Sequence, residues 1–432
     1  MKRSIVWFKS DLRLQDNETL IKAIAQSDEI IPVYCFDDSH FTTTEFGFSK
    51  TGSFRAQFLL ESLIDLDTNL RAIGSGLIII KGKPEIEIVN LAIKHEVYKV
   101  FAKEEVAFEE IQTQNLVEKE LLKINCQLET FDTSTLYHEQ DLPFAIKDIP
   151  DVFTNFRKRV ERESKIRAVF AKPLEINSPN IPSLELPTLA DLSLKEIKMD
   201  NRAAIQFKGG ETEAWKRLTH YFFQTKSLSV YKETRNGLVG LDYSSKFSAW
   251  LALGCISARS IYAQIKKYEK EIVSNDSTYW LVFELLWRDY FRFMLIKYGN
   301  GFFHKYGISG VKDKEMKFHK YGFNKWVNGE TGSDFVDANM LELKLTGFMS
   351  NRGRQNVASY LCNNLKLDWR YGAAYFEQQL IDYDVCSNWG NWAYLAGVGN
   401  DPRSNRVFNI EKQANDYDKN KVYRGQWLVV SS

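Results

Sequence analysis

The sequence has few cysteines, few prolines and no long apolar run. Its five cysteines form no CxxC pair in 432 residues, which excludes a disulfide framework and indicates reduced thiols in a cytoplasmic protein. No window approaches the roughly 18 consecutive apolar residues of a membrane-spanning helix. The charged start MKRSIVWFKSDLR is not typical of a signal peptide. We therefore expect a soluble protein without a membrane partner.

Charge of neither sign dominates, because the formal net charge is +1. A polyanionic partner would therefore have to bind a local patch. The segment 155–170 is basic, but such a run is more typical of a solvated helix face than of a nucleic-acid site. We predict no metal site and expect a monomer.

Proline and tryptophan divide the chain. Most of the nine prolines fall between Pro143 and Pro187, and Trp7 is the one tryptophan of ten that precedes residue 201. A proline-rich stretch between two differently composed halves predicts an irregular connector. We predict an N-terminal domain over 1–132, a connector over 133–200 and a C-terminal domain over 201–432.

The first half alternates short apolar runs with amphipathic stretches. This alternation predicts an α/β domain with a parallel sheet covered by helices. The expected strands are 4–8, 30–36, 77–80, 97–102 and 127–131, and the expected helices are 17–25, 54–73, 85–94 and 108–123. The segment after the first strand, KSDLR, is not a GxGxxG turn, so the standard dinucleotide-binding fingerprint is absent there.

The second half has apolar residues at helical spacing, which predicts an all-α domain. The expected helices are 214–225, 258–271, 280–298, 334–346, 355–365 and 373–380.

A first cluster of polar residues precedes an apolar run at Ala249. Three hydroxyls and a lysine at a helix start suit a phosphate group, although a plain serine N-cap is the commoner explanation of an isolated SSxxS. The cluster comprises Ser244, Ser245, Lys246, Phe247 and Ser248.

A second cluster lies on the expected helix 280–298. Glu284, Trp287, Arg288 and Phe291 are spaced to share adjoining helix faces. Charged groups on an otherwise apolar helix need partners, so we expect a polar ligand or an ion pair.

Two further clusters combine arginine, asparagine and aspartate. In 347–356, Asn351 and Arg354 begin an expected helix and suit an anion or the edge of a heterocycle. In 382–394, paired aspartates, two asparagines and two tryptophans are unfavourable for a helix. Asp382 and Asp384 either form ion pairs with Arg354 or hold a bound ligand.

These clusters resemble the photolyase/cryptochrome family, and most closely its cryptochrome DASH branch. The resemblance extends from residue 3 to about 427. It is carried by WFKSDLRLQDN (7–17), GGETEAWKRL (209–218), ELLWRDYFRF (284–293), GFMSNRGRQNVASYL (347–361) and LIDYDVCSNWGNWAYLAGVGNDPRSNRVFN (380–409).

The resemblance implies a photolyase-type N-terminal domain and a helical domain that binds FAD. The residues implied to contact FAD are Tyr231, Ser244, Ser245, Lys246, Phe247, Ser248, Arg288, Asn351, Arg354, Asp382, Asp384 and Asn388. Asn388 is implied to face flavin N5. A neutral amide can form a hydrogen bond with N5–H there without a change in its own protonation.

The implied activity is light-driven repair of cyclobutane pyrimidine dimers, with Glu284, Trp287 and Asn388 as catalytic residues. Glu284 and Trp287 match the residues that contact a flipped dimer. Gln355 and Tyr394 stand where photolyases of double-stranded DNA carry Met and Trp, which implies single-stranded or looped DNA as the substrate.

Trp392 and Trp369 match the inner and middle members of the family's electron-transfer chain. Met316 stands where the outer tryptophan is expected, ten residues before Trp326. Either the loop is shifted, or Tyr321 or Trp326 substitutes, or reduction from the surface is impaired.

The resemblance also implies an antenna pigment, 5,10-methenyltetrahydrofolate, with Glu105 as its acidic contact. Two other functions stay open. A signalling photoreceptor is expected to carry a long segment after the flavin domain, and only five residues follow Trp427. A light-independent flavoprotein would not need the pair Glu284 and Trp287.

Overall fold

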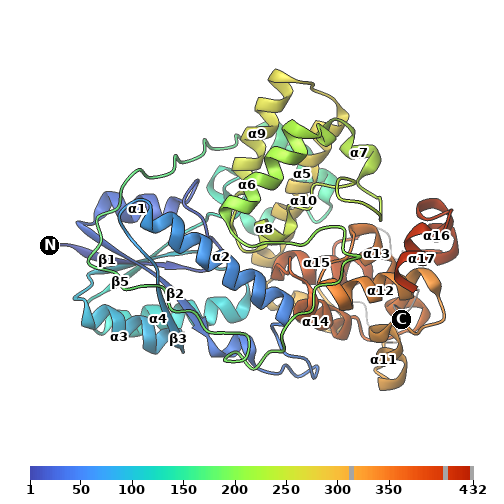
Figure 1. The fold of residues 1–432 in the computed structure, drawn as a ribbon, viewed down its shortest axis with the longest axis horizontal. Helices are drawn as coiled ribbons and strands as arrows, with labels where there is room; N and C mark the ends of the chain where they lie inside the picture. The colour runs from blue at the N-terminus through green and yellow to red at the C-terminus, as the bar shows by residue number, and fades with distance from the viewer. Residues whose placement is uncertain (311–315, 402–406, 429–432) are drawn as a thin grey trace.

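The computed structural model describes residues 1–310, 316–401 and 407–428. Two lobes lie side by side along the long axis of the molecule (Figure 1). The α/β lobe contains β1 (Arg3–Phe8), α1 (Glu18–Gln26), β2 (Glu29–Asp37), α2 (Ser53–Arg71), β3 (Ile78–Gly82), α3 (Pro84–Lys94), β4 (Lys99–Lys103), α4 (Phe108–Leu122) and β5 (Gln127–Phe131).

The five strands form one parallel sheet in the order β3-β2-β1-β4-β5, as the alternating pattern predicts. Alternate residues of β1 pack on opposite faces. Val6 and Phe8 contact the core that contains α1 and α2. Ile5 and Trp7 contact a separate core with α3 and α4. The sheet is therefore covered on both faces, and the predicted α/β class is confirmed.

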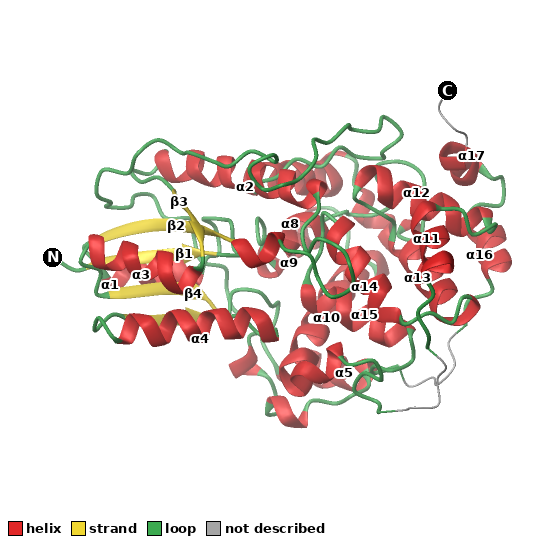
Figure 2. Ribbon diagram, turned by 90° about the horizontal axis from the view of Figure 1, so that it is seen from below, coloured by secondary structure: helices red, strands yellow, loops and turns green. Residues whose placement is uncertain are grey.

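Strand order reverses between β1 and β4. Such a switch point leaves a crevice at the carboxyl ends of the two strands, which is where open α/β sheets bind ligands. These ends carry Lys9 and Ser10 after β1 and Lys103, Glu104 and Glu105 after β4. Figure 2 shows that the sheet, in yellow, ends toward the helical lobe.

The second lobe is helical, as predicted. Its helices are α6 (Glu211–Thr219), α7 (Tyr231–Thr234), α8 (Ser248–Ala252), α9 (Ala258–Glu271), α10 (Asp276–Tyr298), α11 (Lys320–Asn328), α12 (Asp334–Thr346), α13 (Asn351–Ser359), α14 (Trp369–Gln379), α15 (Val385–Leu395), α16 (Ile410–Tyr417) and α17 (Val422–Leu428).

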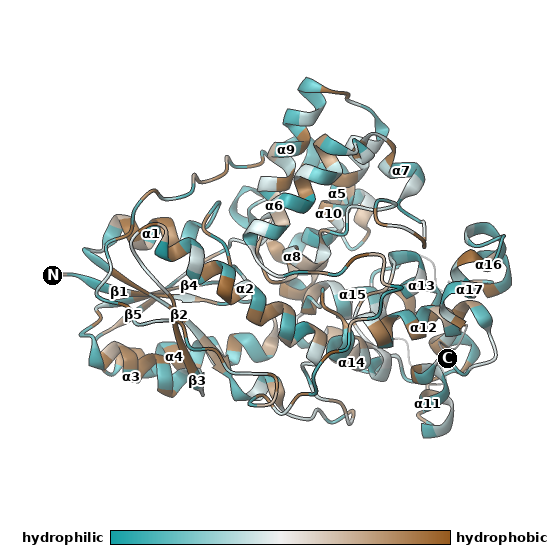
Figure 3. Cartoon of the chain, in the orientation of Figure 1, coloured by the Kyte–Doolittle hydropathy of each residue, from teal (hydrophilic) through white to brown (hydrophobic). Residues whose placement is uncertain are grey.

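Helix α10 is the central element of this lobe. It begins at a capping box, in which the Asn275 side chain accepts from Ser277 and Thr278, and it continues for 23 residues. Most of its buried side chains are aliphatic or aromatic. In Figure 3 helix α9 alternates teal and brown, as expected of a helix with one exposed face.

The connector predicted over 133–200 is largely irregular, but it contains helix α5 (Phe153–Glu163). Its later part runs along the α/β lobe, where Ile176 N donates to Ile73 O and Ile30 N donates to Asn177 O. The basic residues of α5 form ion pairs within the helix, such as Arg157 with Glu161 at 2.6 Å, which fits a solvated face.

The GGETEAW motif joins the two lobes. The carboxylate of Glu211, at the start of α6, accepts from the backbone N–H groups of Leu14 at 2.8 Å and Gln15 at 3.1 Å. Arg13 is buried and donates to the carbonyls of Gly254, Asp16 and Thr133. Backbone groups of distant segments are thus satisfied by two buried charges, which fixes the lobes against each other.

One local prediction is wrong. The segment 382–394 looks unfavourable for a helix, yet Val385–Leu395 forms α15. Asp384 supplies the N-cap, since its side chain accepts from Ser387 N at 2.7 Å. The tryptophans of α15 are buried against α14 and α10, so packing outweighs the weak intrinsic propensity.

Candidate functional site

A cavity of about 690 Å³ lies in the helical lobe. It brings together segments that are far apart in the sequence, from Val152 to Asn400. The predicted site residues that line it are Tyr231, Ser244, Ser245, Lys246, Phe247, Ser248, Glu284, Trp287, Arg288, Asn351, Arg354, Gln355, Asp382, Asp384 and Tyr394. The four sequence clusters therefore form one site.

Lys246 is a buried cation at the wall of this cavity. Its residue is 3% exposed, and its Nζ lies 3.3 Å from the centre of the Tyr243 ring without a hydrogen-bond partner. Burial lowers the pKa of Lys246 to about 7, the neighbouring Arg217 lowers it further, and Glu342 opposes the shift. A bound anion would supply the missing partner.

Arg217 of α6 holds the backbone around Lys246 in place. Its guanidinium donates to the carbonyls of Ser245 at 3.0 Å and Ser244 at 3.0 Å, and it pairs with Asp242 at 2.7 Å. Lys246 itself has a positive φ of 57°, so this tightly bonded loop imposes an uncommon backbone conformation. The sequence motif gave no indication of this support from α6.

Arg354 and Asp382 form the predicted ion pair across the cavity, with 2.8 Å between Nη2 and Oδ2. The second carboxylate oxygen of Asp382 is buried and has no hydrogen-bond partner. The two explanations of this aspartate are therefore compatible, because one oxygen pairs with arginine and the other stays available to a ligand.

Asp384 has a different environment from Asp382. Burial alone would raise the pKa of Asp384, but the charge of Arg288, the hydrogen bond from Ser387 and the charge of Arg292 together lower it. The group is therefore an anion at neutral pH. Asp384 and Ala252 line both this cavity and a second cavity described below, so the wall between the two is thin.

Glu284 has an ion-pair partner, which is one of the two alternatives that the sequence left open. Arg235 Nη1 lies 2.6 Å from Glu284 Oε1, and 28% of the Glu284 side chain is exposed. Burial raises the pKa of Glu284, and Arg235 opposes the shift. Arg235 belongs to the segment that follows Tyr231, but sequence spacing could not reveal its partner 49 residues away.

Trp287 lies between other rings. Phe153 of α5 stacks on it with centroids 3.7 Å apart and planes at 13°, and Tyr394 meets it edge-on at 5.8 Å. Phe153 is a second residue that sequence reasoning missed, because it belongs to the connector. This stacking fixes the orientation of the indole ring.

Asn388, Trp392 and Trp369 are not among the residues that line the cavity. Asn388 is 8% exposed and its Nδ2 donates to Ala373 O at 3.0 Å. Trp392 packs against Gly372 so closely that a Cβ there would lie 2.3 Å from its ring. Trp369 lies on the same helix, α14, one turn before Gly372.

The outer electron-transfer position is occupied by a buried Met316, which is 6% exposed. Trp326 contacts Trp392, with centroids 6.2 Å apart, but it is completely buried. Tyr321 is 73% exposed on α11 and lies against Lys325. Of the two residues that could replace the missing tryptophan, Trp326 contacts Trp392 and Tyr321 is exposed to solvent.

A second cavity of about 220 Å³ lies between the lobes, at the switch point of the sheet. Glu105 lines it and is paired with Lys103 at 3.3 Å and with Lys9 at 3.9 Å. Burial would raise the pKa of Glu105, but the two lysines lower it. Burial lowers the pKa of Lys9 to about 8 and raises that of Glu110 to about 7.

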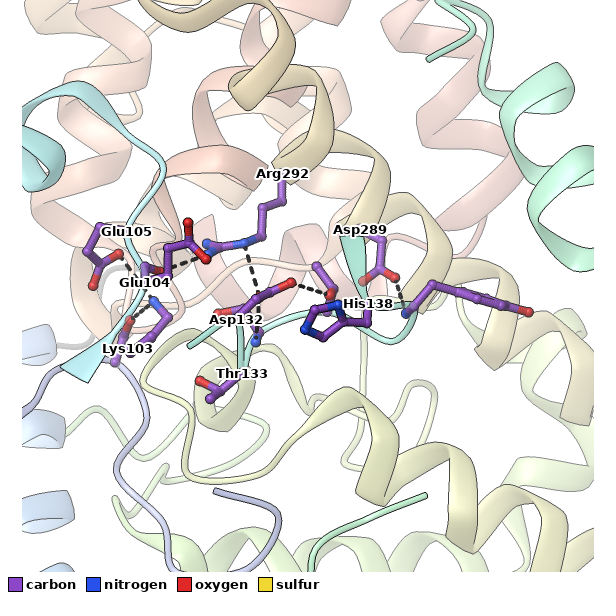
Figure 4. Close-up of polar contacts among 12 residues, drawn as sticks. Lys103, Glu104, Glu105, Asp132, Thr133, His138, Asp289 and Arg292 are labelled. Atoms are coloured by element: carbon purple, nitrogen blue, oxygen red, sulfur yellow. Dashed lines mark hydrogen bonds and ion pairs between the residues drawn. The ribbon is translucent and has the colours of Figure 1, made fainter. Parts of the chain in front are cut away.

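A polar network joins this cavity to α10. Figure 4 shows Lys103, Glu104 and Glu105 at the end of β4, facing Arg292 of α10. Arg292 Nη2 donates to Glu104 O at 3.0 Å, and its Nε lies 3.8 Å from Asp132 Oδ1. Because Arg288 of the same helix faces the larger cavity, α10 contributes side chains to both sites.

The larger cavity suits FAD. The unpartnered Lys246 ammonium matches a diphosphate, and the free oxygen of Asp382 matches a donor of a ribose or flavin ring.

Within the described ranges, no group of three or more His, Cys, Asp or Glu side chains is arranged to hold a metal ion. In the same ranges, no helix is long and apolar enough to cross a membrane.

Comparisons with known proteins agree with this geometry. Residues 4–178 match the family model of DNA photolyase, and residues 280–430 match that of the FAD binding domain of DNA photolyase. Cryptochrome DASH of Gloeobacter violaceus is 50% identical over 430 residues, which cover 99% of this chain and 85% of that protein.

Two solved structures have the same fold. The cryptochrome of Synechocystis sp. PCC6803 superposes with a TM-score of 0.96 at 48% identity, over 99% of this chain and 89% of that one. A class III photolyase from Agrobacterium tumefaciens gives a TM-score of 0.85 at 26% identity, over 99% and 86% of the two chains.

The fold and the site thus define a photolyase-like flavoprotein with an FAD-binding helical lobe. The chain belongs to the photolyase/cryptochrome family, and within it to the cryptochrome DASH branch. The family resemblance of the sequence motifs is therefore confirmed.

Proposed function

We propose that this protein repairs cyclobutane pyrimidine dimers in single-stranded or looped DNA under blue light. The observation that carries the proposal is the position of Glu284 and Trp287. Both line the same cavity as the residues suited to FAD, so a pyrimidine dimer placed against them would lie beside the cofactor. When bound and reduced, FAD supplies on excitation the electron that opens a dimer.

Several side chains would hold the cofactor. Lys246 and the hydroxyls of Ser244, Ser245 and Ser248 would bind the diphosphate. Arg354 and Asp382 would bind the flavin and ribose edges through the groups that the ion pair leaves free. Asn388 remains our prediction for the residue at flavin N5. Its Nδ2 donates to Ala373 O, and a rotation of the side chain away from this carbonyl would free the amide for N5.

Glu284 and Trp287 would hold the substrate. A flipped dimer loses its stacking in the DNA, and an exposed indole face offsets part of that cost. Phe153 stacks on one face of Trp287, which leaves the other for the substrate. Glu284 would accept a hydrogen bond from a pyrimidine N–H, and its raised pKa increases the fraction able to donate to a carbonyl.

The preference for single strands rests on Gln355 and Tyr394. Both line the cavity, and Tyr394 meets Trp287 edge-on rather than offering a parallel face. We therefore expect these two residues to contribute little stacking, which would not offset the breaking of two base pairs in duplex DNA.

The decisive experiment is repair of one thymine dimer under blue light, in matched single-stranded and duplex oligonucleotides. We expect fast repair of the single strand and slow repair of the duplex. Equal rates would contradict the single-strand preference alone. The absence of repair in both, with FAD bound, would contradict the repair function and favour the alternative of a signalling photoreceptor.

We propose that the smaller cavity holds the antenna, 5,10-methenyltetrahydrofolate, with Glu105 as the acceptor of a pterin N–H. The cavity lies next to the larger one, which suits energy transfer between two pigments. Denaturation of freshly purified protein would release a pterin in addition to FAD. A cytoplasmic location and a monomeric state complete the proposal.

A further inference from the structure

A row of aromatic rings leads from Trp392 to the cavity between the lobes. Trp392 packs against Gly372 of α14, and Trp369 lies one turn earlier on that helix. Trp369 meets Trp389 edge-on with centroids 5.7 Å apart. The indole Nε1 of Trp389 donates to the hydroxyl of Tyr383 at 3.3 Å. Tyr383 lines the interdomain cavity. The row therefore ends at a surface that a small molecule in that cavity can reach.

Tyr383 shares the cavity wall with a carboxylate. Glu377, a residue that is 8% exposed, lines the same cavity, and its charge acts on the Tyr383 phenol. Burial raises the pKa of Glu377, against the lowering effect of Arg55. Oxidation of tyrosine releases the phenol proton, so a neighbouring carboxylate with raised basicity is a suitable acceptor.

Other exits from the row are less suitable. Met316 occupies the outer position, and Trp326 is completely buried. Tyr371 is half-buried, and its ring neighbours are Phe46, Phe318 and Phe323. Phenylalanine is much harder to oxidise than tryptophan or tyrosine, so a path through these rings is blocked.

We propose that Tyr383 is the outermost electron donor of this protein, with Glu377 as the acceptor of its proton. This role replaces that of the tryptophan whose place Met316 takes. The inference rests on the proposed function, because it requires bound FAD that is reduced in the light.

Each turnover moves one electron from a thiol to the flavin. Bound FAD would supply the oxidant on excitation. Trp392 would give up one electron, Trp369 would replace it, and Trp389 would then replace the electron of Trp369. Tyr383 then gives one electron to Trp389 and one proton to Glu377. In protein without the antenna pigment, a thiol that enters the interdomain cavity returns one electron to the tyrosyl radical. Glu377 returns the proton, and the oxidised thiol loses its own proton to water and pairs with another to form a disulfide.

The test uses the FAD-loaded protein and four variants: Tyr383→Phe, Glu377→Gln, Tyr371→Phe and Trp392→Phe. Bound FAD is counted after denaturation, and thermal unfolding checks the fold. Light-induced electron paramagnetic resonance, with and without ring-deuterated tyrosine, identifies a tyrosyl radical. Loss of visible flavin absorption with dithiothreitol under light gives the rate of photoreduction.

We expect Tyr383→Phe to lose the tyrosyl signal and to be photoreduced more slowly at unchanged FAD content. Glu377→Gln keeps the Tyr383 ring but removes the proton acceptor, and we expect photoreduction to be slower by about a hundredfold. In the wild type we expect photoreduction to show a solvent isotope effect. Tyr371→Phe is the matched control and should behave as the wild type.

An undiminished tyrosyl signal in Tyr383→Phe would overturn the assignment of Tyr383, and so would a loss in Tyr371→Phe. If Trp392→Phe abolishes photoreduction while Tyr383→Phe does not, the further inference fails and the proposed cofactor chemistry stands. If FAD is absent from all the proteins, both fail together.

Discussion

The two cavities differ in how their charges are balanced. In the larger cavity Lys246 and one oxygen of Asp382 are buried without hydrogen-bond partners. In the smaller cavity Lys9, Lys103 and Glu105 pair with one another. A buried charge without a partner destabilises the empty protein and gains that energy back when a ligand binds.

This difference indicates how firmly each cavity should hold its ligand. FAD would contact charges that have no partner in the empty protein, whereas an antenna pigment would have to replace existing ion pairs. We therefore expect FAD to be retained through purification and the antenna to be bound more weakly. Each of the following predictions tests a part of this contrast.

The largest effect is expected from Lys246→Met. Loss of a buried cation that pairs with a diphosphate should weaken FAD binding by about 30-fold or more, which corresponds to about 2 kcal/mol. The FAD-free variant should melt at the same temperature as the FAD-free wild type or higher, because an unpaired charge is gone. Fluorimetric titration of released FAD measures the affinity.

Lys216→Met is the matched control, since Lys216 lies on α6 with an exposed side chain paired to Glu213. It should bind FAD as the wild type does. A wild-type affinity in Lys246→Met would remove Lys246 from the cofactor site.

Trp287→Ala tests the substrate side of the larger cavity. Stacking on an aromatic ring is worth about 1–3 kcal/mol per base, so the affinity for a single-stranded dimer should fall about 5- to 150-fold. FAD content should not change. Fluorescence anisotropy of a labelled oligonucleotide gives the affinity, with Trp215→Ala on α6 as the control. Equal dimer affinity in Trp287→Ala and the wild type would contradict the stacking role.

Glu105→Gln tests the smaller cavity. The loss of a charged hydrogen-bond acceptor should weaken pterin binding by about tenfold. The near-ultraviolet absorption of reconstituted protein measures this occupancy. Glu120→Gln, an exposed change on α4, is the control. Parallel losses of pterin and FAD would show a general disturbance instead of a contact.

The smallest effect is expected from Glu110→Gln. Burial raises the pKa of Glu110 from 4.5 to about 7, and the nearby Glu105 adds to the shift. Its contribution to stability is therefore complete below pH 4.5 and is lost as the pH rises through 7. Relative to the variant, the wild type should lose about 1 kcal/mol of unfolding free energy, after a discount for partial exposure. Urea titrations at several pH values between these limits would measure it, and parallel pH curves would contradict the shift.

Much of the fold was predictable because the signals are local. The apolar runs predicted all five strands to within about two residues at each end. The signal is strongest in β1, β2 and β4, because a strand buried on both faces is mostly apolar. The helix 280–298 was predictable for a related reason, because its apolar residues recur around a long helix. Segment 385–395 was not, because its helix depends on packing of Trp389 and Trp392 against other elements.

The sequence by itself determined the two-part architecture, the family and the residue types of the site. Four clusters with unusual charge on apolar elements indicated where ligands bind, since buried charge needs partners. For Glu284 the sequence left a polar ligand and an ion pair as alternatives and did not indicate the partner.

Only the tertiary structure decided which groups meet. It brought Arg235 to Glu284, Phe153 to Trp287 and Tyr383 to Trp389, pairs that no spacing along the chain encodes. It also left Lys246 unpartnered while it paired Lys9 and Lys103 with Glu105. The physical reason is that hydrogen bonds and stacking act over a few ångströms in space, so the packing of distant segments selects the partners.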